Sequence, residues 1–217
     1  LEKRSILDNT LILFMSDNGG NAEAGPDGKT NGDPTKADSD WFCGQSWAHL
    51  QNTPFRLYKH YNHEGGIASP LIAHWPAAIK DHRWIRSPAH VIDILPTCAD
   101  VAGATYPATF HNKPITPAEG RSLRSVLTGS GELPPRPLFW DHEGNAAIRA
   151  GDLKLVRQGL DGPWQLFNLA TDRTEQNDLA ANHPAEVRQL ATQWNQWAAR
   201  AHAMPKPHSP AKKKTQA

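Results

Sequence analysis

Short apolar runs alternate with turn-forming residues in the first third of the chain. Residues 10–15 (TLILFM) are almost wholly apolar, with Asp8-Asn9 before them and Asp17-Asn18-Gly19-Gly20 after them. A run of this kind is typical of a strand buried on both faces, as in a parallel sheet covered by helices. Residues 70–76 (PLIAHWP) predict a second buried strand that ends at its proline. Between them, residues 20–53 are dense in Gly, Asn, Asp and Pro, which predicts a long surface loop of the functional or mobile kind.

A helical pattern follows in residues 90–103. Its apolar side chains recur with helical spacing, and Gly103 supplies a C-terminal stop. Pro96 falls early in this helix, where a missing N–H matters least. The apolar positions are 91, 94, 95, 98, 101 and 102.

The pattern changes after a proline-rich segment at residues 133–137. Residues 146–149 and 153–157 predict a β-hairpin around a short glycine turn, and residues 164–169 predict a third strand. Pro184 then opens an amphipathic helix, because proline is tolerated at the first helical position. Antiparallel strands closed by one helix indicate a small α+β subdomain. The predicted domains are residues 1–132, residues 133–204 and a disordered tail at 205–217.

Composition excludes several classes of function. The 217 residues carry 23 basic and 22 acidic side chains, so a net charge of +1 gives no global field that favours nucleic acid. No apolar run approaches the roughly 18 residues that would span a membrane. Cys43 and Cys98 lack zinc-type spacing, and the sequence leaves open whether they pair. Cys98 is expected to be a small buried core residue.

Candidate chemistry begins where the first predicted strand ends, at Asp17-Asn18-Gly19-Gly20. In open α/β sheets, ligands gather beyond the carboxyl ends of strands. A carboxylate and an amide oxygen are hard ligands suited to Ca²⁺ or Mg²⁺, and the glycines let the backbone turn so that both side chains can converge. The same four residues also fit an ordinary Asx-Gly turn, and the tetrapeptide alone leaves both interpretations open.

A second cluster of polar residues lies in residues 53–70, where cations and imidazoles precede a Gly-Gly pair. The ammonium of Lys59 is a compact point charge with three donors, which suits a tetrahedral oxyanion such as sulfate or phosphate. A solvated basic loop is the alternative interpretation.

Together these segments resemble the sulfatase family, particularly the arylsulfatases. Residues 12–20 (ILFMSDNGG) and 59–66 (KHYNHEGG) carry the resemblance. The later segments 70–76, 90–97, 153–156 and 164–169 fall in the same order as in that family, so the resemblance extends from about residue 8 to 180.

The resemblance implies a fold and a set of site residues. The fold is the C-terminal part of an α/β/α sandwich of the alkaline-phosphatase type, followed by the small α+β subdomain. Asp17 and Asn18 match two ligands of an active-site Ca²⁺, and Lys59 matches the lysine that contacts the sulfate group and its bridging oxygen. Residues 64–66 shape the turn that presents this lysine. His142, in the expected polar loop at 140–145, is a candidate contact to the rest of the substrate, with an ordinary surface histidine as the alternative.

Other parts of the family's active site are absent from the sequence. The chain contains no Cys/Ser-x-Pro-x-Arg motif, from which the family's formylglycine nucleophile is made, and it lacks the remaining metal-binding aspartates. We expect these parts to precede Leu1. The chain is therefore predicted to be an inactive portion of a sulfate-ester hydrolase, with the aryl or carbohydrate part of the substrate undetermined and with a periplasmic, secreted or lysosomal location. The alternatives are a phosphodiester or phosphonate hydrolase of the same superfamily and a non-catalytic anion- or sugar-binding remnant.

Overall fold

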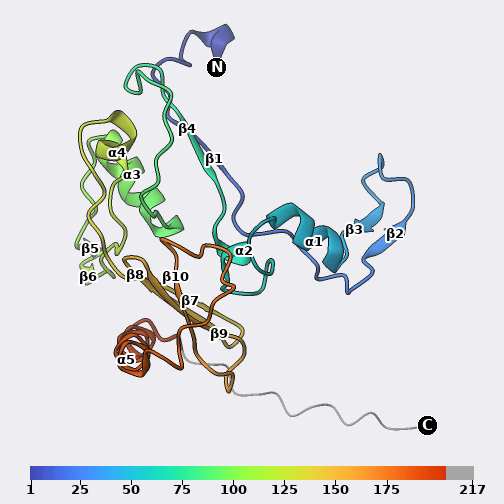
Figure 1. The fold of residues 1–217 in the computed structure, drawn as a ribbon. Helices are drawn as coiled ribbons and strands as arrows, with labels where there is room; N and C mark the ends of the chain where they lie inside the picture. Colours follow the sequence, from blue (N-terminus) through green and yellow to red (C-terminus); the bar gives the residue numbers. More distant parts are fainter. Residues whose placement is uncertain (204–217) are drawn as a thin grey trace. The chain divides into compact units, whose positions relative to one another are not determined.

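The computed structural model describes residues 1–203, which form two compact units (Figure 1). The first unit combines residues 1–17 with 70–135, and the second combines residues 18–69 with the chain from Arg136 onward. The chain passes from the first unit to the second inside the proline-rich segment. The predicted domain limits stay a prediction, and the predicted tail at 205–217 lies outside the described residues.

The first unit is built on strands β1 (Ile12–Met15) and β4 (Leu71–His74), which pair antiparallel. Leu13, Leu71 and Ala73 pack against the residues around helix α4 (Arg124–Thr128). On the other side of this pair, Phe14 lies opposite Ile72, and the two are 70% and 62% exposed. The expectation of parallel strands buried on both faces is therefore wrong for β1 and β4. An apolar run does not indicate whether the neighbouring strand is parallel or antiparallel. In the first unit, only one face of this strand pair packs against other residues.

The helix predicted at 90–103 is confirmed. It consists of the 3₁₀ turn η2 (Val91–Asp93), which continues into α3 (Ile94–Val101). Its buried positions are Asp93 and Thr97 rather than the apolar stripe. Asp93 Oδ1 accepts a hydrogen bond from Arg121 N (2.8 Å), and Thr97 Oγ1 accepts one from Leu123 N (2.9 Å).

The prediction that Cys98 is buried is wrong. It lies on the exposed side of α3, because the packed side of this helix is the polar one that carries Asp93 and Thr97. Cys43 is also an exposed, free thiol. The first unit is completed by the short elements η1 (Glu2–Arg4), β5 (Thr109–Phe110) and β6 (Lys113–Pro114).

The second unit holds a four-stranded antiparallel sheet in the order β10-β9-β8-β7. The predicted hairpin is confirmed as β8 (Asn145–Ala150) and β9 (Leu153–Arg157), and the third strand as β10 (Gln165–Asn168). The polar loop expected at 140–145 is instead the hairpin of β7 (Leu138–His142) and β8, because Glu143 and Gly144 take positive φ values of 49° and 88° and close a tight turn.

The helix predicted from Pro184 is confirmed as α5 (Pro184–Arg200), which packs on one face of this sheet (Figure 1). Its apolar stripe forms the larger core of the unit. The core residues are Ala146, Ile148, Leu155, Leu166, Leu190, Trp194 and Ala198. On the opposite face Val156, Phe167, Ala147 and Leu169 form a smaller buried cluster.

The segment at 20–53 is more ordered than a plain surface loop. It contains the short hairpin of β2 (Lys29–Asn31) and β3 (Asp40–Phe42), then helix α1 (Gln45–Asn52). Helix α2 (Glu64–Ile67) follows where a Gly-Gly turn was expected. Within residues 1–203, no helix has the length and apolar character that a membrane span requires.

Candidate functional site

The two glycine-containing segments singled out from the sequence meet through their backbones in the second unit. Gly19 N donates to the carbonyl of Gly66 (3.0 Å), and Lys59 N donates to the carbonyl of Gly20 (2.9 Å). Gly20 N in turn donates to Oδ1 of Asn52 at the end of α1 (2.9 Å). The structure therefore brings residues 18–20 and 59–66, which are far apart in the sequence, to one place.

This close approach explains why glycine occupies these positions. A Cβ atom on Gly19 would lie 1.8 Å from the carbonyl oxygen of Gly65, and one on Gly66 would lie 1.9 Å from that of Tyr61. Both distances are far inside van der Waals contact with backbone atoms, which cannot swing away as a flexible side chain can. The glycines allow the backbone contacts that position the segment carrying Lys59.

Lys59 is partly buried, with 29% of its side chain exposed, and its ammonium pairs with Glu23 Oε1 at 3.1 Å. The hydrogen bond from Lys59 is the largest cause that lowers the pKa of the Glu23 carboxyl. Glu23 is itself more than half exposed. A cation held mainly by one exposed carboxylate can exchange that partner for an anionic ligand.

The predicted calcium ligands are the consecutive residues at which the chain passes from the first unit to the second. Asp17 is exposed and ends the first segment of the first unit, and Asn18 is half-buried and begins the second unit. Their side chains offer a carboxylate and an amide oxygen, the donor types that Ca²⁺ takes. Two donors are a partial set, since calcium takes six to eight oxygens.

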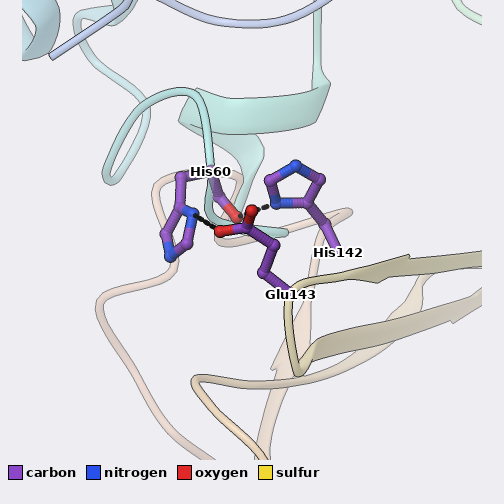
Figure 2. A group of neighbouring side chains, drawn as sticks. All are labelled: His60, His142 and Glu143. Carbon is purple, nitrogen blue, oxygen red and sulfur yellow. Dashed lines mark hydrogen bonds and ion pairs between the residues drawn. The ribbon is translucent and has the colours of Figure 1, made fainter. Parts of the chain in front are cut away.

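His142 lies beside the segment that carries Lys59. Its Nδ1 is 3.2 Å from the carbonyl oxygen of His60, the residue that follows Lys59. Asn145 Nδ2 donates to the same carbonyl (3.0 Å), and His60 Nδ1 lies 3.2 Å from Glu143 Oε2. Figure 2 shows the carboxylate of Glu143 between the two imidazole rings. The hairpin of β7 and β8 thus supplies polar side chains next to Lys59.

A buried ion network, which the sequence pattern did not predict, contacts this segment through Glu64. Lys154 Nζ on β9 lies 2.9 Å from Glu64 Oε1 and 2.9 Å from Glu175 Oε1, and all three side chains are almost fully buried. Glu64 N also donates to Glu175 Oε2 (2.7 Å). One signal was present in the sequence: Lys154 is the single charged residue among apolar neighbours in residues 153–156.

The two carboxyl groups that share Lys154 have different electrostatics. Burial raises the pKa of Glu175, and the attraction of Lys154 offsets this only in part. Burial also acts to raise the pKa of Glu64, but the attraction and hydrogen bond of Lys154, with help from Arg173, leave it below its ordinary value. The charged form is therefore favoured more strongly at Glu64 than at Glu175.

His63 is a second buried titratable group next to this network. Its side chain is fully buried, and its Nε2 lies 3.3 Å from Oε1 of Gln165 on β10. Burial, together with the positive charges of Lys154 and Arg56, lowers the pKa of His63 to about 3. The imidazole is neutral at physiological pH and contributes to the packing of the second unit.

Comparisons with known proteins indicate one family. A family model described as Sulfatase matches residues 1–104. An uncharacterized sulfatase of Schizosaccharomyces pombe is 30% identical over 208 residues, which is 87% of this chain and 37% of the relative. A sulfatase of Formosa agariphila is 28% identical over 197 residues, which is 83% of this chain and 30% of the relative.

Solved structures give the same result for the fold. The structure of Ps i-CgsB in complex with k-i-k-neocarrahexaose matches 91% of this chain and 38% of its own, with 26% identity and a TM-score of 0.67. The chain thus spans less than two fifths of each of these three relatives. The expected α/β fold of the alkaline-phosphatase type is confirmed. With the family model, the sequence relatives and the fold in agreement, the chain belongs to the sulfatase family of the alkaline-phosphatase-like superfamily.

Proposed function

We propose that this chain is part of a sulfuric-ester hydrolase that cleaves sulfate monoesters. The observation that carries the proposal is the placement of Lys59. Its side chain is partly exposed, and its backbone is hydrogen-bonded to the Asn18-Gly19-Gly20 segment that follows the proposed calcium ligand Asp17.

Lys59 has the chemistry that sulfate-ester cleavage needs. When the S–O bond to the leaving group breaks, negative charge develops on the bridging oxygen. An ammonium that donates to this oxygen stabilises the developing charge. The ammonium pairs with Glu23, and this carboxylate is more than half exposed, so a sulfate group displaces it at small cost.

Asp17 and Asn18 are the proposed calcium ligands from this chain. Their hard oxygen donors fit Ca²⁺, and we propose that residues outside this sequence complete the coordination shell. When bound, calcium supplies positive charge that stabilises the sulfate oxygens. The role of this chain is to fix Asn18 next to two glycines whose backbone contacts also position Lys59.

The nucleophile has to come from outside these residues. The sequence contains no Cys/Ser-x-Pro-x-Arg motif, so the proposed formylglycine lies elsewhere, and the 217-residue chain is proposed to be inactive by itself. An exported location, whether periplasmic, secreted or lysosomal, remains part of the proposal.

The organic part of the substrate is proposed to be an aryl group or a carbohydrate. Relatives include a steryl-sulfatase of Mus musculus and an N-acetylgalactosamine-6-sulfatase of Canis lupus familiaris, and Ps i-CgsB was solved with k-i-k-neocarrahexaose. His142 is the side chain that we propose to contact this organic part, because it is exposed and lies next to the residue that follows Lys59.

The test compares ester classes on a protein that contains this chain together with a formylglycine-bearing segment. The proposal predicts turnover of 4-nitrophenyl sulfate that exceeds turnover of a 4-nitrophenyl phosphodiester and of a phosphonate monoester. Faster cleavage of either phosphorus ester would favour the phosphoryl alternative. Absence of turnover for all three, in a protein shown by mass spectrometry to carry formylglycine, would favour a non-catalytic binding role.

A further inference from the structure

Two imidazoles and one carboxylate converge at the turn between β7 and β8 (Figure 2). His60 comes from the segment that carries Lys59, and His142 and Glu143 come from the hairpin. One potential ligand atom from each of the three residues lies within 4.8 Å of the other two. The rings of His60 and His142 are nearly perpendicular, with centroids 5.4 Å apart, so they do not stack face to face.

We propose that His60, His142 and Glu143 bind a transition-metal ion of the zinc type, at a site distinct from the proposed calcium ligands. Imidazole nitrogen and carboxylate oxygen are ordinary zinc ligands, and three protein ligands leave a fourth position for water. Two nitrogen donors make the site a poor one for Ca²⁺, which takes oxygen ligands.

The spacing of the three side chains suits this ion. Zinc bonds of about 2.0–2.1 Å in a tetrahedral arrangement place neighbouring ligand atoms roughly 3.4 Å apart. His60 Nδ1 and Glu143 Oε2 are already at 3.2 Å. All three side chains are at least partly exposed, so small rotamer changes bring the third ligand atom closer without disturbing a core.

The second shell of the site is also present. His142 Nδ1 lies 3.2 Å from the carbonyl of His60. A hydrogen bond between a ring nitrogen and a backbone carbonyl restricts the orientation of the imidazole, as around metal-binding histidines. The same carbonyl is held by Nδ2 of Asn145, whose side chain is buried.

The backbone supports the same conclusion. His60 has a φ value of 92°, in the left-handed region that non-glycine residues seldom adopt, whereas the φ value of 49° at Glu143 belongs to the tight β7–β8 turn. A conformation such as that of His60 costs energy and tends to occur where a site needs the side chain in a given direction. Here both residues direct their side chains toward each other. A bound ion would link the segment next to Lys59 to the β7–β8 turn within the second unit.

The experiment is a calorimetric titration of the untagged 217-residue chain with ZnCl₂, and it does not depend on catalysis. We expect uptake of one ion with an affinity that falls roughly tenfold or more in His142→Ala and in Glu143→Gln, because each loses one of three ligands. His82→Ala is the matched control, since His82 is an exposed histidine outside the cluster, and it should bind zinc as the unmodified chain does. Circular dichroism of each variant shows whether the fold is retained.

Two further results would overturn the proposal. One is an unmodified chain that takes up no zinc, or variants with intact folds that bind it as tightly as the unmodified chain. The other is displacement of zinc by a tenfold excess of CaCl₂, which would show a site built from oxygen ligands. Failure of the sulfatase assay leaves this inference standing, because the titration reads metal binding alone.

Discussion

The ammonium of Lys154 on β9 donates to Oε1 of Glu64 on α2 at 2.9 Å, and both side chains are almost fully buried. Glu64 begins the short helix whose glycines contact the segment that carries Lys59. The ion pair therefore connects the antiparallel sheet to the candidate site within the second unit. The position of Lys59 depends on buried charges as well as on backbone contacts.

Replacement of Lys154 by methionine should strongly destabilise the second unit. The change leaves the carboxylates of Glu64 and Glu175 buried without their cation, and breaking a buried pair in this way typically costs about 3–5 kcal/mol. The free energy of unfolding can be measured by urea titration, followed by tryptophan fluorescence, to which Trp194 in the core contributes. Lys29→Met is the matched control, because Lys29 forms an exposed pair with Asp40 and should cost about 0–1 kcal/mol. Equal effects of the two changes would contradict a structural role for the buried pair.

Gly66→Ala should disrupt the segment that presents Lys59. The added methyl group would meet the carbonyl oxygen of Tyr61 at 1.9 Å, so the backbone has to move. We expect a loss of more than about 2 kcal/mol in unfolding free energy, as for other overpacked buried positions. Gly131→Ala is the control, since its nearest neighbour, Ser125 Cβ, is 3.5 Å away. A Gly66→Ala variant as stable as the unmodified chain would show that the backbone approach is not required.

His63 should make the second unit sensitive to mild acid. Its pKa is lowered to about 3 in the folded chain, against an ordinary 6.5, so the unfolded chain binds a proton between these values and the folded chain does not. Above pH 6.5 the imidazole is neutral in both states, and His63 does not lower the free energy of unfolding. As the pH falls below 6.5, protonation of His63 in the unfolded chain lowers the free energy of unfolding, by about 2 kcal/mol at pH 5.

The measurement for His63 is the unfolding free energy at pH 7.5 and pH 5 for the unmodified chain and for His63→Gln. Glutamine does not titrate, so the variant should lose less stability between the two pH values, whatever its stability at pH 7.5. A variant with the same pH dependence as the unmodified chain would show that His63 is not the group responsible.

Glu23→Gln should strengthen the binding of inorganic sulfate by a few-fold at low ionic strength. The change removes the carboxylate that forms an ion pair with Lys59 and that would repel an anion. Calorimetric titration with sodium sulfate measures the effect, and Glu132→Gln, at another exposed glutamate, controls for the change in net charge. Weaker sulfate binding in Glu23→Gln would mean that Glu23 positions Lys59 instead of competing for it.

Much of the secondary structure was predictable because local patterns determine it. The spacing of apolar residues predicted the β8–β9 hairpin, β10 and the helices α3 and α5, and proline at the first helical position marked the start of α5. Strand direction was not predictable in the same way, because an apolar run such as that of β1 carries no information about which neighbour it pairs with. The exposure of Cys98 was missed because Asp93 and Thr97, two polar residues, make the buried contacts of their helix.

The candidate site was also predictable only in part. Lys59 and the segment at 18–20 could be identified from their residue types and glycines, and the structure brings them together. The network of Lys154, Glu64 and Glu175 could not be derived, because its members are up to 111 residues apart and only tertiary folding places them in contact. Whether His142 contacts substrate and Asp17 binds calcium stays a prediction.

The central claim is that Lys59 stabilises the leaving oxygen of a sulfate ester. Its most direct test is the kcat for 4-nitrophenyl sulfate of a protein that joins this chain to a formylglycine-bearing segment, measured for the unmodified protein, Lys59→Met and Lys29→Met. The account predicts a loss of about 10²–10³-fold in kcat for Lys59→Met, no loss for the exposed Lys29→Met, and no turnover by the 217-residue chain alone. A Lys59→Met variant that retains the full kcat, or turnover by the chain alone, would contradict it.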